Sequence, residues 1–513
     1  MDIRLPIEVL TILKQLQNAS FDAYIVGGAV RDLLLENQSI TDFDFTSNAT
    51  PDQILNLFPE SFYENSFGTV SITKEHLHEL LPAPIEIDTT AILESDTHRH
   101  KVIDITTASK IHRSLQSATK LRTVENKEVY EITTYRSDGA YANKRHPESV
   151  SWGTTLREDV DRRDFTINAL ALSVDLKAFE GLFKQEQLPQ LVRIPATNYT
   201  LHDFHNGVED LSKKSIRTVG DPNVRFNEDA LRMLRAIRFS VQLGMEIETE
   251  TYQALVKNAS LLSHVSWERI THEFFKMLAS AQPRKAIELL DQTNMLSAIL
   301  PELLTAKGVV QGGHHTTDVW EHSLAALETC PSKDPLVRLA TLIHDIGKPA
   351  TYSVQSGSPT FYNHEIIGSR VAKTISRRLK LSNSESDRLF ILVRYHMFHY
   401  QPENTDASIR RFMRKVGLEN LDDILDLREG DRLGSGARKT SWRLEEMKER
   451  MIDQLHQPFS ITDLAINGHD LIDTLGMKPG PELGKLLQQL FEEVLENPEL
   501  NTKETLLKMA SQS

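Results

Sequence analysis

The sequence contains very little cysteine, because Cys330 is the only one among 513 residues. A single thiol excludes an internal disulfide framework and fits a reducing compartment such as the cytosol, so we expect a cytoplasmic protein. The chain also has no hydrophobic run long enough to span a bilayer, and its first residues lack the basic and apolar regions of a signal peptide. We therefore expect no membrane partner.

Positive charge is also in short supply. The chain has 58 lysines and arginines against 72 aspartates and glutamates, which gives a formal net charge of −14. This balance argues against broad, non-specific binding of nucleic acid, which needs a basic face, but it leaves room for a local basic groove. A hydrophobic content of 40% indicates a globular chain, and its length is enough for two to four domains.

The hydrophobic pattern predicts strands mixed with short helices in the first part of the chain and almost only helices from Glu228 onward. The fold class that we expect is therefore α+β. The expected elements are a helix over 1–20, a strand, glycine turn and helix over 23–35, strands over 40–47, 66–73 and 129–136, and a helix over 50–58.

Composition and periodicity also predict four domains. No internal repeat is apparent, and glycine-rich segments near 307–315 and 433–440 are candidate boundaries. The domains that we expect are an N-terminal head over 1–175 with an insertion over about 74–128, a helical segment over 176–300, a histidine-rich helical segment over 301–440 and a helical tail over 441–513.

A glycine pair followed by a basic residue marks the first candidate site. Gly27 and Gly28 come directly after a short apolar strand and open a helix that carries Arg31. A tight turn onto a helix N-terminus exposes backbone N–H groups and a guanidinium to an anion. The pattern is weak by itself, because most such turns are structural.

Two aspartates follow about ten residues later. Asp42 and Asp44 flank Phe43, and residues two apart on a strand share one face. Adjacent carboxylates repel each other unless a cation lies between them, and Mg²⁺ is the usual cation. A solvated strand face is the plainer interpretation of the pair alone. Together with the glycine turn upstream, the pair predicts a magnesium site.

Four segments taken together resemble one enzyme family. VGGAVRDLLL with DFDF resembles the first motif of the polymerase-β nucleotidyltransferases, and RRDFTINAL (162–170) resembles the second motif of class II CCA-adding enzymes and bacterial poly(A) polymerases. EDALRMLRAIRF (228–239) is similar to their base-recognition helix, and WERITHEFFKML (267–278) to the motif after it. The resemblance spans roughly 23–280. It implies a polymerase-β-like palm that transfers nucleotides from CTP and ATP to the 3′ end of tRNA.

The resemblance assigns roles to the carboxylates. Asp42 and Asp44 would bind two Mg²⁺ ions, which activate the RNA 3′-hydroxyl and neutralise the triphosphate. We expect Glu131 to be a third catalytic carboxylate, because its strand runs into the loop before the second motif. Glu86 or Asp88 competes for this role, and a surface carboxylate on an edge strand is the plainer interpretation of Glu131.

The second motif supplies candidate residues for the sugar and the phosphates. An arginine fork matches phosphate geometry, and a carboxylate can accept hydrogen bonds from ribose hydroxyls. The resemblance implies that Arg163 contacts the nucleotide and that Asp164 and Asn168 lie near its sugar. Taken alone, this stretch is equally typical of an ion-pair cluster at a helix start.

The third motif supplies candidate residues for the base. Asp229 and Arg232 are three apart on a helix, where an acceptor and a donor lie on the same face. The resemblance implies that they act as a protein template for C and then A, while Arg235 and Arg238 face the triphosphate. An Asp–Arg pair at this spacing is otherwise most often a surface salt bridge.

Two segments stand between these motifs. The segment 74–128 separates two strands that a short turn joins in the family, and we assign it no role. The segment 137–155 carries glycine, proline and serine. The family has a flexible loop at this place that helps the switch from C to A addition, which favours full CCA addition.

Histidines cluster in the second half of the chain. VWEHSL and LIHDIGKPA resemble the HD superfamily, in which helices bring H…HD…D together around a metal. The resemblance implies the ligands His322, His344, Asp345 and Asp431, with His364 and His396 for a second ion. Neutral imidazole and carboxylate suit divalent transition metals such as Mn²⁺, Fe²⁺, Ni²⁺ or Zn²⁺. We expect metal-dependent hydrolysis of a phosphoester, with a catalytically weak fold as the alternative.

The sequence therefore predicts a polymerase-β-like mixed-sheet palm followed by mostly helical domains that include an HD domain. Its expected activity is template-independent addition of CCA to the tRNA 3′ end from CTP and ATP. The rivals are a poly(A) polymerase, a CC-only or A-only tRNA nucleotidyltransferase, and an HD phosphohydrolase whose N-terminal half binds RNA. The oligomeric state does not follow from the sequence.

Overall fold

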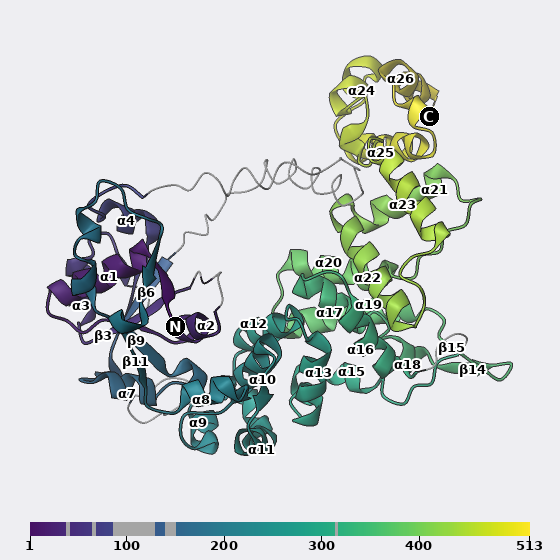
Figure 1. The fold of residues 1–513 in the computed structure, drawn as a ribbon. Coiled ribbons are helices and arrows are strands. Elements are labelled where there is room, and N and C mark those ends of the chain that lie inside the picture. Colours follow the sequence, from purple (N-terminus) through teal and green to yellow (C-terminus); the bar gives the residue numbers. More distant parts are fainter. Residues whose placement is uncertain are drawn as a thin grey trace. The chain divides into compact units, whose positions relative to one another are not determined.

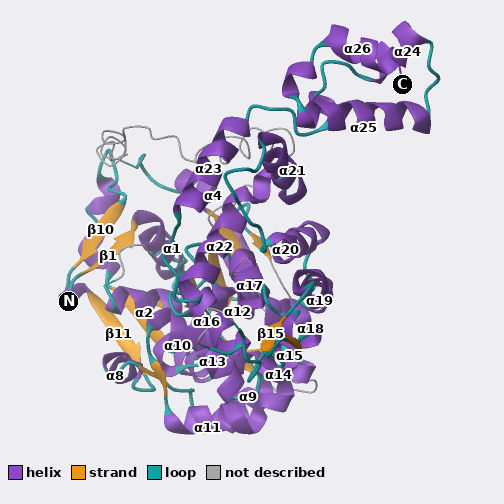
Figure 2. Cartoon of the chain, turned by 90° about the vertical axis from the view of Figure 1, so that its right-hand side faces the viewer, coloured by secondary structure: helices purple, strands orange, loops and turns teal. Residues whose placement is uncertain are grey.

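The structure is a computed structural model that describes residues 1–36, 40, 42–63, 68–85, 129–138, 150–312 and 317–512. The described residues form two compact units, one ending at Ile299 and one beginning at Leu300. The strands are concentrated in the first unit, and the second unit is almost entirely helical (Figure 2). Among the described residues, no helix combines the length and the apolar character that crossing a bilayer requires.

A seven-stranded mixed sheet is the centre of the first unit (Figure 1). Its strand order is β11–β9–β2–β3–β6–β5–β4, and all neighbours are antiparallel except β3 and β6, which run parallel. The strands are β2 (Tyr24–Val26), β3 (Asp44–Ser47), β4 (Phe62–Tyr63), β5 (Thr69–Thr73), β6 (Val129–Thr134), β9 (Leu170–Val174) and β11 (Tyr199–Asp203). Since β11 belongs to this sheet, the head draws on residues up to Asp203.

Short helices pack against this sheet. Helix α1 buries Ile7, Leu10 and Leu13, and Thr50 caps α3 through a reciprocal capping box with Gln53. The helices of this part are α1 (Ile7–Asn18), α2 (Gly28–Leu34), α3 (Pro51–Leu57), α4 (Lys74–Glu79), α7 (Leu156–Asp161) and α8 (Gly207–Ser212). The 3₁₀ turns are Thr166–Asn168, Leu176–Phe179, Leu182–Lys184 and Ala196–Asn198.

Helices complete the first unit after the sheet. Helix α10 packs against α12 and α13, and its buried face includes Met233, Leu234 and Ile237. The elements are α9 (Pro222–Glu228), α10 (Leu231–Leu243), α11 (Thr249–Asn258), the 3₁₀ turn Ala259–His264, α12 (Trp267–Leu278), α13 (Pro283–Gln292) and α14 (Leu296–Ile299). The first unit also contains two two-stranded pairs, β7 (Arg136–Asp138) with β8 (Val150–Trp152) and β12 (Ser215–Ile216) with β13 (Glu246–Ile247).

The second unit is a helical array in which α16 packs on α22 and α19 packs on α20. Its C-terminal part has a separate apolar core around Leu490 and Phe491. The helices are α15 (Pro301–Leu304), α16 (Val319–Thr329), α17 (Pro335–Ile343), α18 (Lys348–Thr351), α19 (His364–Arg378), α20 (Asn383–Tyr395), α21 (Asp406–Val416), α22 (Leu421–Gly434), α23 (Trp442–Gln454), α24 (Gly468–Leu475), α25 (Pro481–Glu496) and α26 (Lys503–Gln512). The hairpin β14 (Ser353–Gln355) and β15 (Ser358–Thr360) and the 3₁₀ turns Leu418–Asn420, Ile461–Asp463 and Pro498–Leu500 complete it.

The structure differs from the expected elements at three places. Residues Ile3–Pro6 form a strand, β1, that pairs with β10 (Leu191–Ile194), so the first helix begins only at Ile7. Strand β3 begins at Asp44, which leaves Asp42 just before the strand. The pair β12–β13 and the β14–β15 hairpin add strands to the helical part. Partners distant in the sequence decide the first of these differences, because β10 supplies the hydrogen bonds that stabilise β1.

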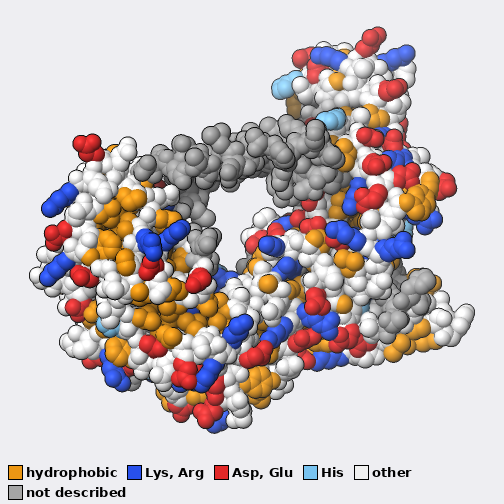
Figure 3. All heavy atoms as spheres, in the orientation of Figure 1, with side chains coloured by type: hydrophobic (Ala, Val, Ile, Leu, Met, Phe, Trp, Pro, Cys, Tyr) orange, Lys and Arg blue, Asp and Glu red, His pale blue; other side chains and the backbone are white. Residues whose placement is uncertain are grey.

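Charge of both signs is spread over the molecule. On the face drawn in Figure 3, acidic and basic side chains are interspersed over both units. The basic side chains that matter for function are therefore those gathered in cavities, as described next.

Candidate functional site

The glycine turn after β2 approaches an arginine closely. Gly27 has a φ of +76°, which favours glycine, and a Cβ atom placed there would lie 3.0 Å from Nη1 of Arg163. The same Cβ would lie 3.6 Å from Oδ2 of Asp44. The turn thus brings the start of α2 against the second motif and the strand that carries Asp44.

The two aspartates line a cavity of about 510 Å³ next to this turn. Asp44 is the first residue of β3 and pairs in register with Val26 on β2, and Asp42 lies two residues earlier. Burial and the charge of Asp42 raise the pKa of Asp44 to about 6, although Arg163 acts to lower it. A cation between the two carboxylates would relieve both effects, so the donor set fits Mg²⁺.

Glu131 stands beside Asp44 on the neighbouring strand. The parallel register of β3 and β6 places Asp44 opposite Glu131, so both side chains are on the same face of the sheet. Glu131 is not among the residues that line the 510 Å³ cavity. Its catalytic role stays a prediction. The competing residues Glu86 and Asp88, and most of the segment 74–128, lie outside the described residues.

Asp164 is the centre of a buried polar network in the same cavity. Its Oδ2 accepts a hydrogen bond from Nε of Arg235 at 2.6 Å, and its Oδ1 accepts from Nδ2 of Asn168 at 3.4 Å. Arg31 donates through Nη1 to Oδ1 of Asn168 at 2.8 Å. Burial acts to raise the pKa of Asp164, but the charges of Arg235 and Arg232 outweigh it and hold the pKa below its ordinary value.

Several arginines have their guanidinium groups in or around this cavity. Arg163 donates to Oδ2 of buried Asp159 at 3.2 Å. Arg238 forms an ion pair with Glu273 of α12 at 2.6 Å, and their side chains are 10% and 4% exposed. Arginines fixed in this way present a preformed positive surface to a polyphosphate. The sequence motifs predict all of these arginines but not their partners Asp159 and Glu273.

The expected base-recognition pair lies where α9 meets α10. Asp229 follows α9 with an extended backbone, and Arg232 is in the first turn of α10. Arg232 forms an ion pair with Glu228 and donates through Nη2 to the backbone oxygen of Arg162 at 3.0 Å. The ion pair with Glu228 therefore fixes the position of the Arg232 side chain.

Arg269 is a site residue that the sequence analysis did not single out. It lies in α12, and its Nη2 is 2.7 Å and its Nη1 is 3.3 Å from the two carboxylate oxygens of Asp229. Lys276, about two turns further along α12, lines the same cavity. Both lie in the segment 267–278, which the family resemblance had marked, so the signal was present in the sequence.

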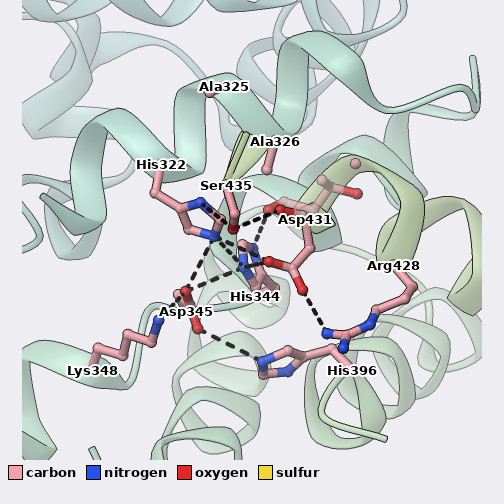
Figure 4. A network of polar contacts seen from close by, with 12 residues as sticks. His322, Ala325, Ala326, His344, Asp345, Lys348, His396, Arg428, Asp431 and Ser435 are labelled. Carbon is pink, nitrogen blue, oxygen red and sulfur yellow. Dashed lines mark hydrogen bonds and ion pairs between the residues drawn. The ribbon is translucent and has the colours of Figure 1, made fainter. Parts of the chain in front are cut away.

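A second cluster lies in the second unit, among α16, α17, α19, α20 and α22 (Figure 4). His322, His344 and Asp345 form one group of three close ligand atoms, and Asp345, His364 and His396 form another. All five side chains are buried. Asp345 belongs to both groups, so its carboxylate joins two potential metal sites.

These five residues and Asp431 are called the histidine–aspartate centre. The distances within it suit a bound metal. Nε2 of His322 is 3.1 Å from Nε2 of His344 and 3.3 Å from Oδ1 of Asp431. In the other group, Nε2 of His364 is 3.3 Å from both Nε2 of His396 and Oδ1 of Asp345. Ligands about 2.0–2.2 Å from one ion are separated by roughly these distances.

Backbone carbonyls fix the orientation of three of these imidazoles. Nδ1 of His344 donates to the oxygen of Thr341 at 2.7 Å, and Nδ1 of His364 and of His396 donate to the carbonyls three residues earlier at 2.8 Å. A carbonyl can only accept, so Nδ1 carries a proton in each ring and Nε2 is the atom that faces the centre.

The electrostatics of this centre also call for positive charge. Although burial pulls the other way, Asp345 and Asp431 raise the pKa of His344 to about 10. The pKa values of Asp345 and Asp431 are held well below the ordinary range, because charged neighbours outweigh the cost of burial. Lys348 is one such neighbour, with Nζ 2.6 Å from Oδ2 of Asp345. A divalent cation fits this donor set.

The centre opens into a cavity of about 640 Å³. Arg428 and Arg432 of α22 line it. Arg428 donates through Nη1 to Oδ2 of Asp431 at 2.7 Å (Figure 4). Phe361 and Tyr362 form part of its wall. A negatively charged ligand of nucleotide size would therefore meet both ligand atoms for a metal and guanidinium groups in this cavity.

Family models match consecutive parts of the chain. The model of the poly A polymerase head domain matches residues 23–109 and 104–217. The model of the RNA and SrmB-binding site of polymerase A matches residues 244–307. The model of tRNA nucleotidyltransferase domain 2 matches residues 366–510. The first match covers the 510 Å³ cavity except for Asp229 and the parts contributed by α10 and α12.

Similar proteins cover most of the chain. The CCA-adding enzyme of Anoxybacillus flavithermus is 27% identical over 506 residues, which are 98% of this chain and 96% of that protein. The A-adding tRNA nucleotidyltransferase of Deinococcus radiodurans is 32% identical over 352 residues, 66% of this chain and 75% of that protein. The crystal structure of the Bacillus stearothermophilus CCA-adding enzyme in complex with CTP is similar with a TM-score of 0.62 and 26% identity, covering 98% of this chain and 96% of that chain.

Proposed function

Because the chain belongs to the tRNA nucleotidyltransferase family, we propose that it adds CCA to the 3′ end of tRNA from CTP and ATP. The observation that carries the proposal is the 510 Å³ cavity, which combines the Asp42–Asp44 pair with a ring of fixed arginines and the Asp229–Arg232 pair. Relatives of nearly full length are CCA-adding enzymes. A solved relative binds CTP.

Asp42 and Asp44 would hold magnesium in this reaction. Bound there, Mg²⁺ supplies positive charge to the triphosphate and to the attacking 3′ oxygen. The 3′ oxygen forms a bond to the α-phosphorus, the bond from that phosphorus to the β-phosphate oxygen breaks, and pyrophosphate leaves. Arg163 and Arg235 are positioned to bind the triphosphate, and Asp164 orients Arg235.

Asp229 and Arg232 explain a choice of C and A over U and G. The amino group of cytosine or adenine can donate to the carboxylate of Asp229, while the adjacent ring nitrogen accepts from the Arg232 guanidinium. Uracil and guanine present a carbonyl oxygen and a ring N–H at these positions. The carbonyl would face a carboxylate and the N–H would face a guanidinium, so both contacts would be unfavourable.

Incorporation of labelled CTP and ATP, singly and together, onto tRNA that lacks its CCA end tests this proposal. We expect two C additions followed by one A and then a stop. Asp42→Ala should abolish incorporation. A long A tail on any RNA would mean a poly(A) polymerase, and incorporation that survives loss of Asp42 would contradict the proposed active site.

An A-only enzyme is the second candidate for this site. It is raised by the A-adding relative, which is 32% identical over 66% of this chain, close to the 34% identity of the Bacillus velezensis CCA-adding enzyme over 63%. The same assay separates the two. An A-only enzyme adds A to tRNA that already ends in CC and adds no C to shorter tRNA.

We further propose that the histidine–aspartate centre binds two divalent transition-metal ions and hydrolyses phosphoesters. His322, His344 and Asp431 would hold one ion, and His364 and His396 the other, with Asp345 between them. Such ions polarise a phosphoryl oxygen and lower the pKa of water. Lys348 and Arg428 keep the carboxylates in place through hydrogen bonds to Asp345 and Asp431.

Metal content measured by mass spectrometry tests this second proposal. Wild-type protein reconstituted with Mn²⁺ should retain two ions per chain at this centre after gel filtration. His396→Ala should retain one, and Asp345→Ala none. Hydrolysis of bis(p-nitrophenyl) phosphate should follow the metal content. Wild-type protein that retains no ion and hydrolyses no ester would contradict the proposal.

A further inference from the structure

A second cavity adjoins the histidine–aspartate centre. It measures about 300 Å³, and Arg428 and Arg432 line both this cavity and the 640 Å³ cavity above the centre. The two cavities therefore meet at these arginines. Together they extend from the buried metal ligands His344 and Asp345, just after α17, to the start of α23 at Trp442.

The 300 Å³ cavity, here called the outer cavity, is lined by aromatic rings. Trp442 is 62% exposed, and Phe398 and Tyr400 lie on the segment between α20 and α21. The Arg450 guanidinium donates to the Tyr400 hydroxyl at 3.0 Å, which fixes that ring. An exposed tryptophan leaves a large apolar area in contact with water, which is unfavourable. Its position at a cavity with two other rings is therefore typical of a stacking surface.

Basic side chains alternate with these rings. Arg428 and Arg432 are four residues apart on α22, which separates them by about 6 Å along the helix axis. This is comparable to the step between consecutive phosphates of a nucleic-acid strand. Arg428 lies 5.6 Å from the Phe398 ring centroid, and Arg443 lies 5.3 Å from that of Trp442.

The described residues that line the outer cavity include three arginines and no carboxylate. Arg432 donates to the backbone oxygens of Arg438 and Thr440. Neither Arg432 nor Arg443 contacts a carboxylate among the side chains that the structure describes. In a chain of net charge −14, such unneutralised guanidinium groups between aromatic rings form a local site for an anion with flat, apolar parts.

We propose that the two joined cavities form one groove for single-stranded nucleic acid, with the end of the strand at the histidine–aspartate centre. The inference deepens the proposed hydrolysis of phosphoesters at that centre and rests on it for the reaction. A base stacks on the exposed ring of Trp442, and phosphates contact Arg432 and Arg428. A strand is favoured over a single nucleotide because the rings of the outer cavity lie beyond both arginines, where only a second nucleotide would reach.

The reaction on such a strand is ordinary hydrolysis. Water adds its oxygen to the phosphorus, the ester bond from phosphorus to the sugar oxygen breaks, and that oxygen takes up a proton. A terminal phosphate would leave as inorganic phosphate, and an internal diester would give a phosphomonoester and a free hydroxyl. Neither course changes an oxidation state or needs another reactant.

Photo-crosslinking on the full chain tests where the strand lies. A six-nucleotide RNA that carries 4-thiouridine is irradiated with the protein in EDTA, and the attached peptides are identified by mass spectrometry. We expect attachment in the segment 398–400 or at Trp442. The same experiment with a DNA hexamer identifies the sugar, since equal attachment means single strands in general and RNA-only attachment means a contact to the 2′-hydroxyl. Attachment confined to the 510 Å³ cavity of the first unit would overturn the proposal.

Binding of fluorescein-labelled hexamer gives the energetic readout. Trp442→Ala should weaken binding roughly tenfold, as loss of one stacked base does, and Arg432→Ala should weaken it and reduce its dependence on salt. Arg377→Ala is the matched control, because Arg377 is an exposed arginine on the same unit away from both cavities. If all three variants bind the hexamer with the affinity of the wild type, the proposed groove is wrong.

Hydrolysis separates the failure of the groove from the failure of the centre. For Trp442→Ala, we expect the ratio of kcat/KM for the hexamer to kcat/KM for bis(p-nitrophenyl) phosphate to fall about tenfold. Wild-type protein that hydrolyses the small ester but does not bind the hexamer would contradict the proposed groove. It would still support the proposed hydrolysis at the histidine–aspartate centre. Wild-type protein that crosslinks the hexamer but hydrolyses neither ester would support the groove and overturn the proposed hydrolysis.

Discussion

At the scale of the residue, backbone conformation and close approach make Gly27 irreplaceable. A Cβ atom at φ +76° is strained, and it would stand 3.0 Å from Arg163 Nη1. Gly27→Ala should therefore lower the rate of CTP and ATP incorporation by at least 100-fold, because it displaces Arg163 from the triphosphate. Gly181→Ala is the control, since a Cβ there meets nothing within 4 Å. Wild-type activity of Gly27→Ala would show that the turn tolerates a side chain.

The ion pair of Arg269 with Asp229 is expected to set base choice. Arg269 contacts both carboxylate oxygens of Asp229 and so fixes the direction in which that group accepts a base. For Arg269→Ala we expect kcat/KM for CTP to fall about tenfold and misincorporation of UTP to rise, while Arg269→Lys keeps part of the selectivity. Competition assays with CTP and UTP measure this. Arg284→Ala, an arginine on α13 paired with Glu288, should behave as wild type.

A carboxylate outside both sites predicts a pH dependence of stability. Burial and the charges of Asp423 and Asp422 raise the pKa of Asp426 to about 6. The folded state thus binds this proton more tightly than the unfolded state, so the contribution of Asp426 to the free energy of unfolding decreases as pH rises from about 4 to 6 and stays low above. Asp426→Asn should therefore raise the stability by about 1 kcal/mol at pH 8, after allowance for partial exposure, and by less at pH 5.

Thermal unfolding between pH 5 and pH 8 measures this difference. The control is Asp473→Asn on α24, which removes one carboxylate at an exposed position outside both sites. A constant difference between Asp426→Asn and the wild type would mean that the Asp426 carboxylate titrates normally.

At the scale of the element, α10 and α12 are joined by the buried pair of Arg238 and Glu273. Removing one partner leaves the other charge buried without compensation, so Glu273→Ala should lower the free energy of unfolding by about 3 kcal/mol. Since α10 carries Arg232 and Arg235, incorporation should fall as well. Glu246→Gln is the surface control: its partner is Lys285, Glu246 is 82% exposed, and its loss should cost under about 0.5 kcal/mol. Urea unfolding compares the two.

The helices of the second unit explain why the histidine–aspartate centre is assembled from residues distant in sequence. Each of its histidines lies at or near a helix end, and three donate Nδ1–H to the carbonyl three residues earlier. One turn of helix therefore sets the ring orientation locally. The packing of α16 on α22 then brings His322 to Asp431 across 109 positions of the chain.

At the scale of the whole molecule, the two sites lie in separate compact units. We expect their activities to be separable. Asp44→Ala should abolish nucleotide incorporation and leave the Mn²⁺ content of the second unit unchanged, and Asp345→Ala should do the reverse. Parallel assays of incorporation and metal content measure both. Loss of incorporation in Asp345→Ala, with an unchanged melting temperature, would mean that the two sites are coupled.

Short-range patterns were enough to predict the motifs of both sites and the local elements that carry them. The strand, glycine turn and helix over 23–35 and the capped helix after Thr50 follow from short-range patterns, and both are confirmed. Apolar periodicity and capping residues act within one or two turns of chain, so they can be read locally. The family resemblance is likewise confirmed by relatives that cover most of the chain.

Contacts between residues far apart in the sequence could not be predicted and became known from the folded chain. The pairing of β1 with β10, the start of β3 at Asp44, the contact of Arg269 with Asp229 and the joining of two cavities at Arg428 and Arg432 all depend on segments far apart in the sequence. Such contacts are decided by the packing of whole elements and by the charges that burial forces into pairs. Neither leaves a local pattern in the chain.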